Sequence, residues 1–187
     1  LRRRHALDGD RLQIDISNMI FETCETIINQ NKAAKDFQNF EFELIRFTSI
    51  TSPFTEDEFN SLSETELTDQ LYDIVTKHYK KKVERNALLT YPVIKNVYEN
   101  EGDRYERIVV PFSDGIKTLQ VVTNLKDAYE TKGKSLATDF EKNITLAIID
   151  ENWKDHLRQM DDLKQSVQNA SYEQKDPLLI YKFEAFE

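Results

Sequence analysis

The last third of the chain has the clearest alternation of apolar and polar positions. Its apolar residues recur mostly at steps of three and four, which predicts a long helix with one broad apolar face. These residues are Phe140, Ile144, Ala147, Ile148, Trp153, Leu157, Met160, Leu163 and Val167. Short polar side chains favour a break at residues 169–172, and Asp176 followed by Pro177 is a helix-start signal. Two helices joined by a short loop usually fold back antiparallel, so we expect a helical hairpin with Tyr172 near its tip.

Two more helical patterns occupy the first fifty residues. The first predicts a helix over residues 8–31, with its apolar positions on one side. A shorter helix follows, and Phe37, Phe40, Leu44 and Phe47 line one side of it as expected core positions. Phe42 and Ile45 lie on another side, which indicates burial on two faces or contact with a second layer.

Two helix starts follow in close succession. Thr55 with Glu58 has the capping-box pattern, in which the N-cap residue and the third helical residue exchange hydrogen bonds. Ser63 with Glu66 repeats this pattern eight residues later. We therefore predict a single-turn helix followed by a longer one.

The longer helix is expected to end near a proline. Its inward positions are predicted to be Leu67, Leu71, Ile74, Val75 and His78. Pro92 should limit the helix, because the proline ring collides with the preceding turn and disfavours helix at the residue before it. A further helical piece over residues 93–99 is expected to follow after a kink.

Residues 107–123 change to a β pattern. Two stretches rich in β-branched residues flank residues 113–115, and the Asp-Gly pair within them favours a hairpin turn. Pro111 has no N–H to donate, so its strand should be an edge. An isolated hairpin is marginal in water, and this one must therefore lean on neighbouring helices. Asn124 then offers an N-cap for another helix, with Asp127 at the third helical position.

Composition supports a mostly helical protein. Charged residues make up 32% and hydrophobic residues 39% of the 187 residues, with only 4 Gly and 4 Pro. The predicted fold class is mostly α: a helical bundle with a long scaffold helix and an antiparallel helical hairpin, plus one small β-hairpin near 107–123. The net charge of −9 argues against nucleic acid as a partner, because phosphate contacts need a basic face. The single cysteine, Cys24, lies among isoleucines and is expected to be a buried, inert thiol.

The sequence contains no recognisable catalytic or metal-binding motif. Its four glycines are isolated from one another, so no glycine-rich phosphate loop is predicted. His5, His78 and His156 lack metal-ligand spacing, and no metal site is expected. His156 stands beside Asp155 and near other carboxylates, but such sets are common on charged helices. We predict no catalytic residue in this chain.

Several residues of the last third also form recognisable motifs. They are Trp153-Lys154-Asp155-His156-Leu157, Met160-Asp161, Tyr172-Glu173-Gln174-Lys175-Asp176-Pro177 and Tyr181-Lys182-Phe183-Glu184-Ala185-Phe186. This segment resembles the two-helix finger of the SecA family, the ATPases that drive preprotein export. The resemblance implies three parts: a helical scaffold segment at 1–32, a helical wing domain with a β-hairpin insertion at 33–139, and a truncated two-helix finger at 140–187.

The resemblance implies contact roles for particular residues. Those implied to contact the preprotein or the channel are Tyr172, Gln174 and Lys175. Those implied in finger packing and coupling to the motor are Trp153, Leu157, Met160, Asp176 and Pro177. The implied partners are the SecYEG channel, unfolded preprotein and the motor domains of a parent chain. ATP and magnesium would belong to that parent and not to this chain, which would lie in the cytoplasm, peripheral at the inner face of the bacterial plasma membrane.

Three functions remain open from the sequence. The first is a non-catalytic fragment of a SecA-like translocase that couples the motor to the channel and the preprotein through the finger. It is favoured because the chain begins without Met in a basic run and ends within an amphipathic pattern, as an excised piece would. The second is a freestanding helical adaptor that binds a partner through the 140–187 hairpin. The third is a hydrolase that uses His156 and nearby carboxylates.

Overall fold

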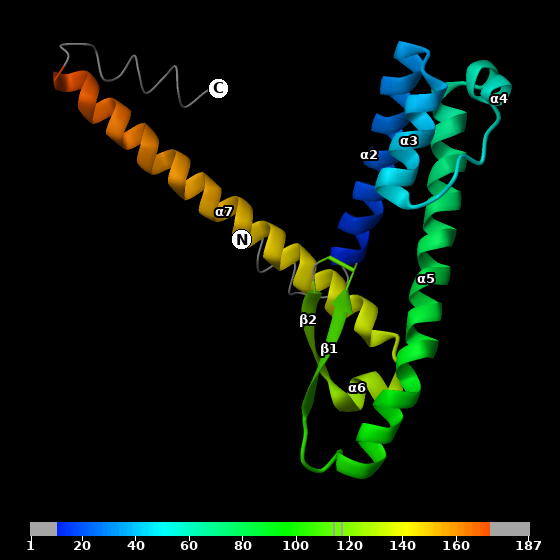
Figure 1. Cartoon of the computed structure of the whole chain (residues 1–187), viewed down its shortest axis with the longest axis vertical. Helices are drawn as coiled ribbons and strands as arrows, with labels where there is room; N and C mark the ends of the chain where they lie inside the picture. The colour runs from blue at the N-terminus through cyan, green and yellow to red at the C-terminus, as the bar shows by residue number, and fades with distance from the viewer. Residues whose placement is uncertain (1–10, 114, 117, 173–187) are drawn as a thin grey trace.

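The computed structural model describes residues 11–113, 115–116 and 118–172, with the side chains of residues 169–172 excepted. Within these residues the chain is mostly helical, with six helices and one small antiparallel sheet, as the sequence predicted (Figure 1). In chain order the elements are α2 (Arg11–Ala34), α3 (Phe37–Thr48), α4 (Glu56–Ser61), α5 (Glu64–Glu101), β1 (Arg107–Ser113), β2 (Thr118–Asn124), α6 (Leu125–Glu130) and α7 (Ser135–Tyr172). The two 38-residue helices α5 and α7 diverge from each other like the arms of a V (Figure 1).

The first hydrophobic core joins α2, α3 and α4 to the beginning of α5. Phe40 is fully buried at its centre, with its ring centroid 4.6 Å from that of Phe59. Cys24 is also fully buried there, as expected, and burial raises the pKa of its thiol to about 11. The buried members of this core are Cys24, Ile27, Ile28, Phe40, Leu44, Phe54, Phe59, Leu67, Leu71 and Val75.

Both predicted capping boxes are present. The Thr55 hydroxyl accepts from the Glu58 backbone N–H while the Glu58 carboxylate accepts from Thr55, and Ser63 and Glu66 repeat this exchange at the start of α5. Hydrogen bonds to the backbone and side chain of Thr55 hold the pKa of Glu58 below its ordinary value. The side chain and backbone of Ser63 lower the pKa of Glu66 in the same way. The local sequence thus determines both helix starts.

Some expected core positions are exposed. Phe47 shares the inner face of α3 but is 57% exposed, because it lies in the last turn, beside a cleft of about 410 Å³ between α3, α5 and α7. Phe42 and Ile45 are exposed as well, so the predicted burial of α3 on two faces is wrong. His78 is exposed on α5, where the prediction placed it inward.

Pro92 does not end α5, which continues to Glu101 as a single helix. A mid-helix proline costs about 3 kcal/mol, because it removes one hydrogen bond and crowds the preceding turn. Packing on both sides offsets this cost, since Ala87 and Ile94 are buried. The carbonyl that loses its donor belongs to Leu88, which is exposed, so water can satisfy it. Tertiary contacts therefore override the local stop signal.

The second core joins the end of α5 to the hairpin, α6 and the start of α7. Strands β1 and β2 pair antiparallel with Ser113 opposite Thr118, so residues 114–117 connect them and β2 begins later than the Asp-Gly turn predicted. Asn124 caps α6 by accepting from the Asp127 N–H, as predicted. The hairpin leans on the helices as expected: Ile108, Val110 and Phe112 pack against a core of Ile94, Leu125, Ala128 and Leu136.

The two cores are separated along α5. The buried residues of this helix are Leu67, Thr68, Leu71 and Val75 in the first core, and Ala87 and Ile94 toward the second. Residues 76–86 contribute none. The helix thus bridges two packed bodies through a stretch that neither of them buries.

Candidate functional site along helix α7

Helix α7 is anchored to the hairpin through its first turns. Leu136 is buried in the second core, and the Phe140 ring lies 4.7 Å from that of Phe112 on β1. The Thr123 hydroxyl on β2 donates to the Asp139 carboxylate over 2.5 Å. A tight turn precedes these contacts, in which Gly133 has φ +82° and packs closely on the α5 backbone at Ala87. These contacts hold the beginning of α7 in place.

A buried carboxylate gives α7 a second attachment. Glu141 is only 7% exposed, and its Oε1 accepts from the Tyr79 hydroxyl on α5 over 2.5 Å. Its Oε2 accepts from the side-chain amide of Gln13 on α2. Burial and the bond to Glu141 raise the pKa of Tyr79, so this hydroxyl stays protonated and remains a donor.

This attachment does not follow from the sequence pattern. The one sign of it in the sequence is the carboxylate of Glu141, which lies on the helix face that carries Ala137, Phe140 and Ile144. A charged residue on an apolar face must find hydrogen-bonding partners when that face is buried.

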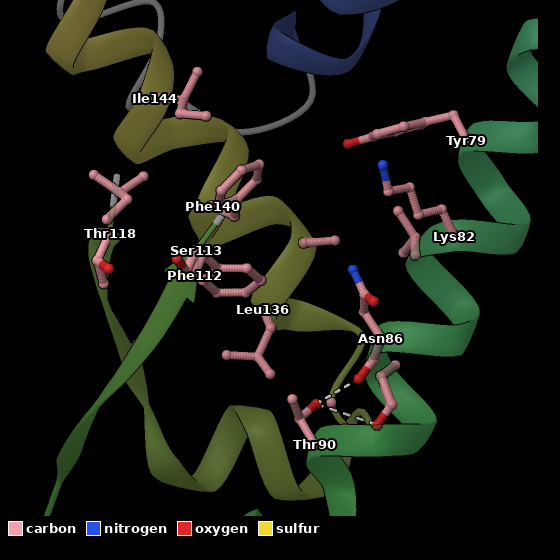
Figure 2. Close-up of a pocket in the computed structure, with 15 residues that line it drawn as sticks. Tyr79, Lys82, Asn86, Thr90, Phe112, Ser113, Thr118, Leu136, Phe140 and Ile144 are labelled. Atoms are coloured by element: carbon pink, nitrogen blue, oxygen red, sulfur yellow. Dashed lines mark hydrogen bonds between the residues drawn. The ribbon is translucent and has the colours of Figure 1, made fainter. Parts of the chain in front are cut away.

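A cavity of about 640 Å³ lies between α5, the hairpin tip and α7. Figure 2 shows Phe112, Leu136 and Phe140 on one side of it, with Lys82 and Asn86 reaching in from α5. Further apolar lining comes from Val83, Ala87, Leu119, Ala137 and Ile144. The start of α7 therefore does not close tightly onto α5.

The second half of α7 carries the packing residues implied by the sequence. Trp153, Leu157 and Met160 are 58%, 47% and 43% exposed. The Trp153 ring contacts His156 of its own helix, with 5.4 Å between ring centroids. Within the part of the chain that the structure describes, the ring contact of Trp153 is with its own helix, and its implied packing in the finger stays a prediction. Helix α7 has by then moved away from α5 and the hairpin (Figure 1).

The apolar residues of α7 do not share one broad face. Successive residues are rotated by about 100°, so the five-residue step from Ile148 to Trp153 turns the apolar side by about 140°. The prediction of a single face is therefore wrong. Phe140 and Ile144 face the rest of the chain, whereas Trp153, Leu157 and Met160 lie on another side.

The predicted break at residues 169–172 is also wrong in its position. Helix α7 includes these residues and ends at Tyr172. Asn, Ser and Tyr cost only some tenths of a kcal/mol each relative to Ala, and without Gly or Pro they do not stop a running helix. Gln174, Lys175, Asp176 and Pro177 lie outside the described residues, as does the second arm of the predicted hairpin.

The polar chemistry of the second half of α7 is that of a solvated helix. Asp155 is engaged by Arg158 at 2.7 Å, and His156 lies against Trp153. No set of His, Cys, Asp or Glu within the described ranges is grouped as metal ligands would be. Among the helices described, none combines the length and apolar character needed to cross a bilayer. Two cores on one long helix, with a second long helix projecting from them, define a mostly helical protein with a two-core architecture.

Comparison with known proteins identifies the family. The whole chain, residues 1–187, matches the family described as SecA Wing and Scaffold domain. The chain belongs to this family, and the resemblance found in the last third of the sequence is confirmed.

Relatives of the chain carry the name protein translocase subunit SecA. Those from Flavobacterium psychrophilum and Christiangramia forsetii are each 61% identical to it, over 99% and 100% of the chain. The relative from Parabacteroides distasonis is 49% identical over 99% of the chain. The chain spans 16–17% of the length of these relatives. No solved structure gives a significant match.

Proposed function

We propose that this chain is the non-catalytic wing and scaffold part of an ATP-driven protein translocase, and that α7 begins the finger that couples the motor to the SecY channel and the preprotein. Membership of the SecA wing and scaffold family supports the translocase assignment. ATP and magnesium are then used by motor domains elsewhere in the parent protein. The partners of this part are SecYEG, unfolded preprotein and those motor domains, at the cytoplasmic face of the bacterial plasma membrane.

The observation that carries this proposal is the one-sided anchoring of α7. Its described attachments lie between Leu136 and Glu141. Farther along, Trp153, Leu157 and Met160 stay exposed, although Leu163 is buried. From Glu141 to Tyr172 the helix spans about 46 Å, because each residue adds about 1.5 Å. A rigid rod held at one end transmits a small rotation at its base into a large displacement at its far end.

The proposal gives the two groups of residues different roles. Trp153, Leu157 and Met160 form the distal apolar face, which packs in the finger and against the motor. Tyr172, at the far end of α7, contacts the preprotein or the channel. An aromatic side chain suits contact with varied sequences, because it buries much area without requiring one partner geometry.

Insertions in α7 of the full-length translocase test the role of the distal face. Two alanines placed between Glu151 and Asn152 rotate this face by about 200° and lengthen the helix by about 3 Å, whereas four alanines rotate it by about 40° and lengthen it by about 6 Å. We expect the two-residue insertion to reduce ATP-driven transport into SecYEG vesicles more than the four-residue insertion. Equal effects, or a worse effect of four residues, would contradict a role for the orientation of this face.

A substitution at Tyr172 tests the contact at the far end. Tyr172→Ala in the full-length protein should reduce transport while leaving nucleotide binding unchanged, because the proposed contact is with the preprotein or the channel and not with the motor. Tyr172→Phe keeps the ring and serves as the matched control. Transport at the normal rate in Tyr172→Ala would remove this residue from the proposed function.

A further inference from the structure

Among the described residues, few contacts fix the angle between α7 and the first core. The first core contains α2, and the second contains the start of α7. Residues 76–86 of α5 run between them without a buried residue. Glu141 spans this gap, because it is bonded to Gln13 on α2 and to Tyr79 on the bridging stretch of α5.

Both oxygens of Glu141 are used in this connection. Glu141 is 7% exposed, and no Lys, Arg or His of the described ranges forms an ion pair with it. A carboxylate withdrawn from water without hydrogen-bond donors is strongly unfavourable, so its partners determine whether it stays buried. When Tyr79 and Gln13 no longer donate, Glu141 gains by returning to water, and α7 must move to allow this.

Apolar packing around Glu141 is sparse. Two open clefts, of about 470 Å³ and 410 Å³, are each lined by both Tyr79 and Glu141, so apolar side chains do not enclose this junction on those sides. The junction between α7, α2 and α5 is therefore held by directional polar bonds more than by close contact of apolar surfaces.

We propose that Glu141, held by Tyr79 and Gln13, is a latch that sets the angle of α7 relative to α2 and the beginning of α5. When the latch opens, α7 and the second core move together relative to the first core, with α5 bending over residues 76–86, while both cores stay folded. A tilt of 10° about Glu141 displaces Tyr172 by about 8 Å, given a rise of about 1.5 Å per residue. Only this consequence for the far end rests on the proposed function; the latch itself does not.

A distance measurement in the intact chain tests the latch. Spin labels are attached to cysteines introduced at Asp69 on α5 and Lys164 on α7, which are both exposed. Cys24 is fully buried with its thiol pKa at about 11, so labelling is selective for the introduced cysteines. Pulsed electron paramagnetic resonance then gives the distribution of distances between the two helices.

The test variant combines Tyr79→Phe with Gln13→Leu, which removes both donors to Glu141. We expect a new or broadened distance population, because each lost bond to a charged acceptor raises the ratio of detached to attached α7 by roughly tenfold.

The matched control combines Tyr72→Phe with Ser17→Ala. It also removes a tyrosine hydroxyl on α5 and its partner on α2, which are 2.5 Å apart, but it leaves α7 untouched. The control should keep the wild-type distribution.

Two results overturn the latch. One is an unchanged distribution in the Tyr79→Phe, Gln13→Leu variant when circular dichroism shows native helicity. The other is the same change in the control variant. Should the double variant unfold, Gln13→Leu alone decides, because Gln13 lies on the exposed surface of α2 and its replacement leaves both cores intact. A transport defect in the insertion variants combined with an unchanged distance distribution would retain the proposed function and reject the latch.

Discussion

Replacing Trp153 with alanine tests directly whether the distal face of α7 is exposed to solvent. A fully buried tryptophan would cost roughly 3–5 kcal/mol on truncation. Here the side chain is 58% exposed, and its ring contact is with His156 on the same helix. Alanine also has the higher helix propensity, by some tenths of a kcal/mol. The free energy of unfolding of the 187-residue chain should therefore change by less than about 1 kcal/mol.

Urea unfolding followed by far-ultraviolet circular dichroism measures this change. Phe40→Ala is the reference variant, because Phe40 is fully buried and its ring lies 4.6 Å from that of Phe59. Its loss should cost roughly 3–5 kcal/mol. The chain contains a single tryptophan, so its native fluorescence reports Trp153 alone. We expect the emission of a water-exposed indole and efficient quenching by acrylamide.

Two outcomes would refute this reasoning. A loss of stability in Trp153→Ala as large as that in Phe40→Ala would mean that the indole is packed against another part of the chain. Blue-shifted emission that resists acrylamide would mean the same. In either case the distal face of α7 would be satisfied within the 187 residues and would not be available to a partner.

Three further results follow from local features. Glu58→Gln and Glu66→Gln should lower the free energy of unfolding at neutral pH and lose this effect in acid. Each carboxyl has a folded pKa below its unfolded value near 4.3, so its stabilising contribution is present above that pH and disappears as the pH falls through the folded pKa. Urea melts at several pH values measure this change. Gly133→Ala should cost about 1–2 kcal/mol in thermal unfolding, since φ is +82° and the new methyl would lie 3.0 Å from the Ala87 carbonyl oxygen. Cys24 should react with iodoacetamide at pH 8 only after denaturant is added, because its thiol pKa is about 11 and it is fully buried.

Features that depend on neighbours in the sequence could be predicted. The capping boxes at Thr55 and Ser63 and the N-cap at Asn124 each require residues only three positions apart, and all three are present. The burial of Cys24 followed from its isoleucine neighbours, and the hairpin from its β-branched residues. In each case tertiary packing agreed with the local preference.

Predicted helix ends failed where tertiary packing or length outweighed a local preference. Pro92 was expected to stop α5, but the buried residues Ala87 and Ile94 hold the helix on both sides. Residues 169–172 were expected to break α7, but each has only a small propensity cost. Exposure of Phe47 could not be foreseen either, because periodicity gives the face of a helix but not how far the core extends along it.

The attachment of α7 could be predicted least of all. Glu141 meets Tyr79 and Gln13, which lie 62 and 128 residues away in the sequence. No periodicity or local motif connects positions so far apart. Only the presence of a carboxylate on an apolar helix face pointed to a buried polar contact, without indicating the partners.

The change of apolar face within α7 has a mechanical consequence. The residues from Leu136 to Ile144 and those from Trp153 to Met160 lie on different sides of one uninterrupted helix. A straight helix cannot press two such sides against the same body, so the two sides serve different contacts. Because α7 has no break before Tyr172, any torque applied at the distal side reaches the junction at Glu141 without being absorbed by a hinge. Among the described attachments of α7, the bonds of Glu141 to Tyr79 and Gln13 are the ones that connect this helix to the middle of α5 and to α2.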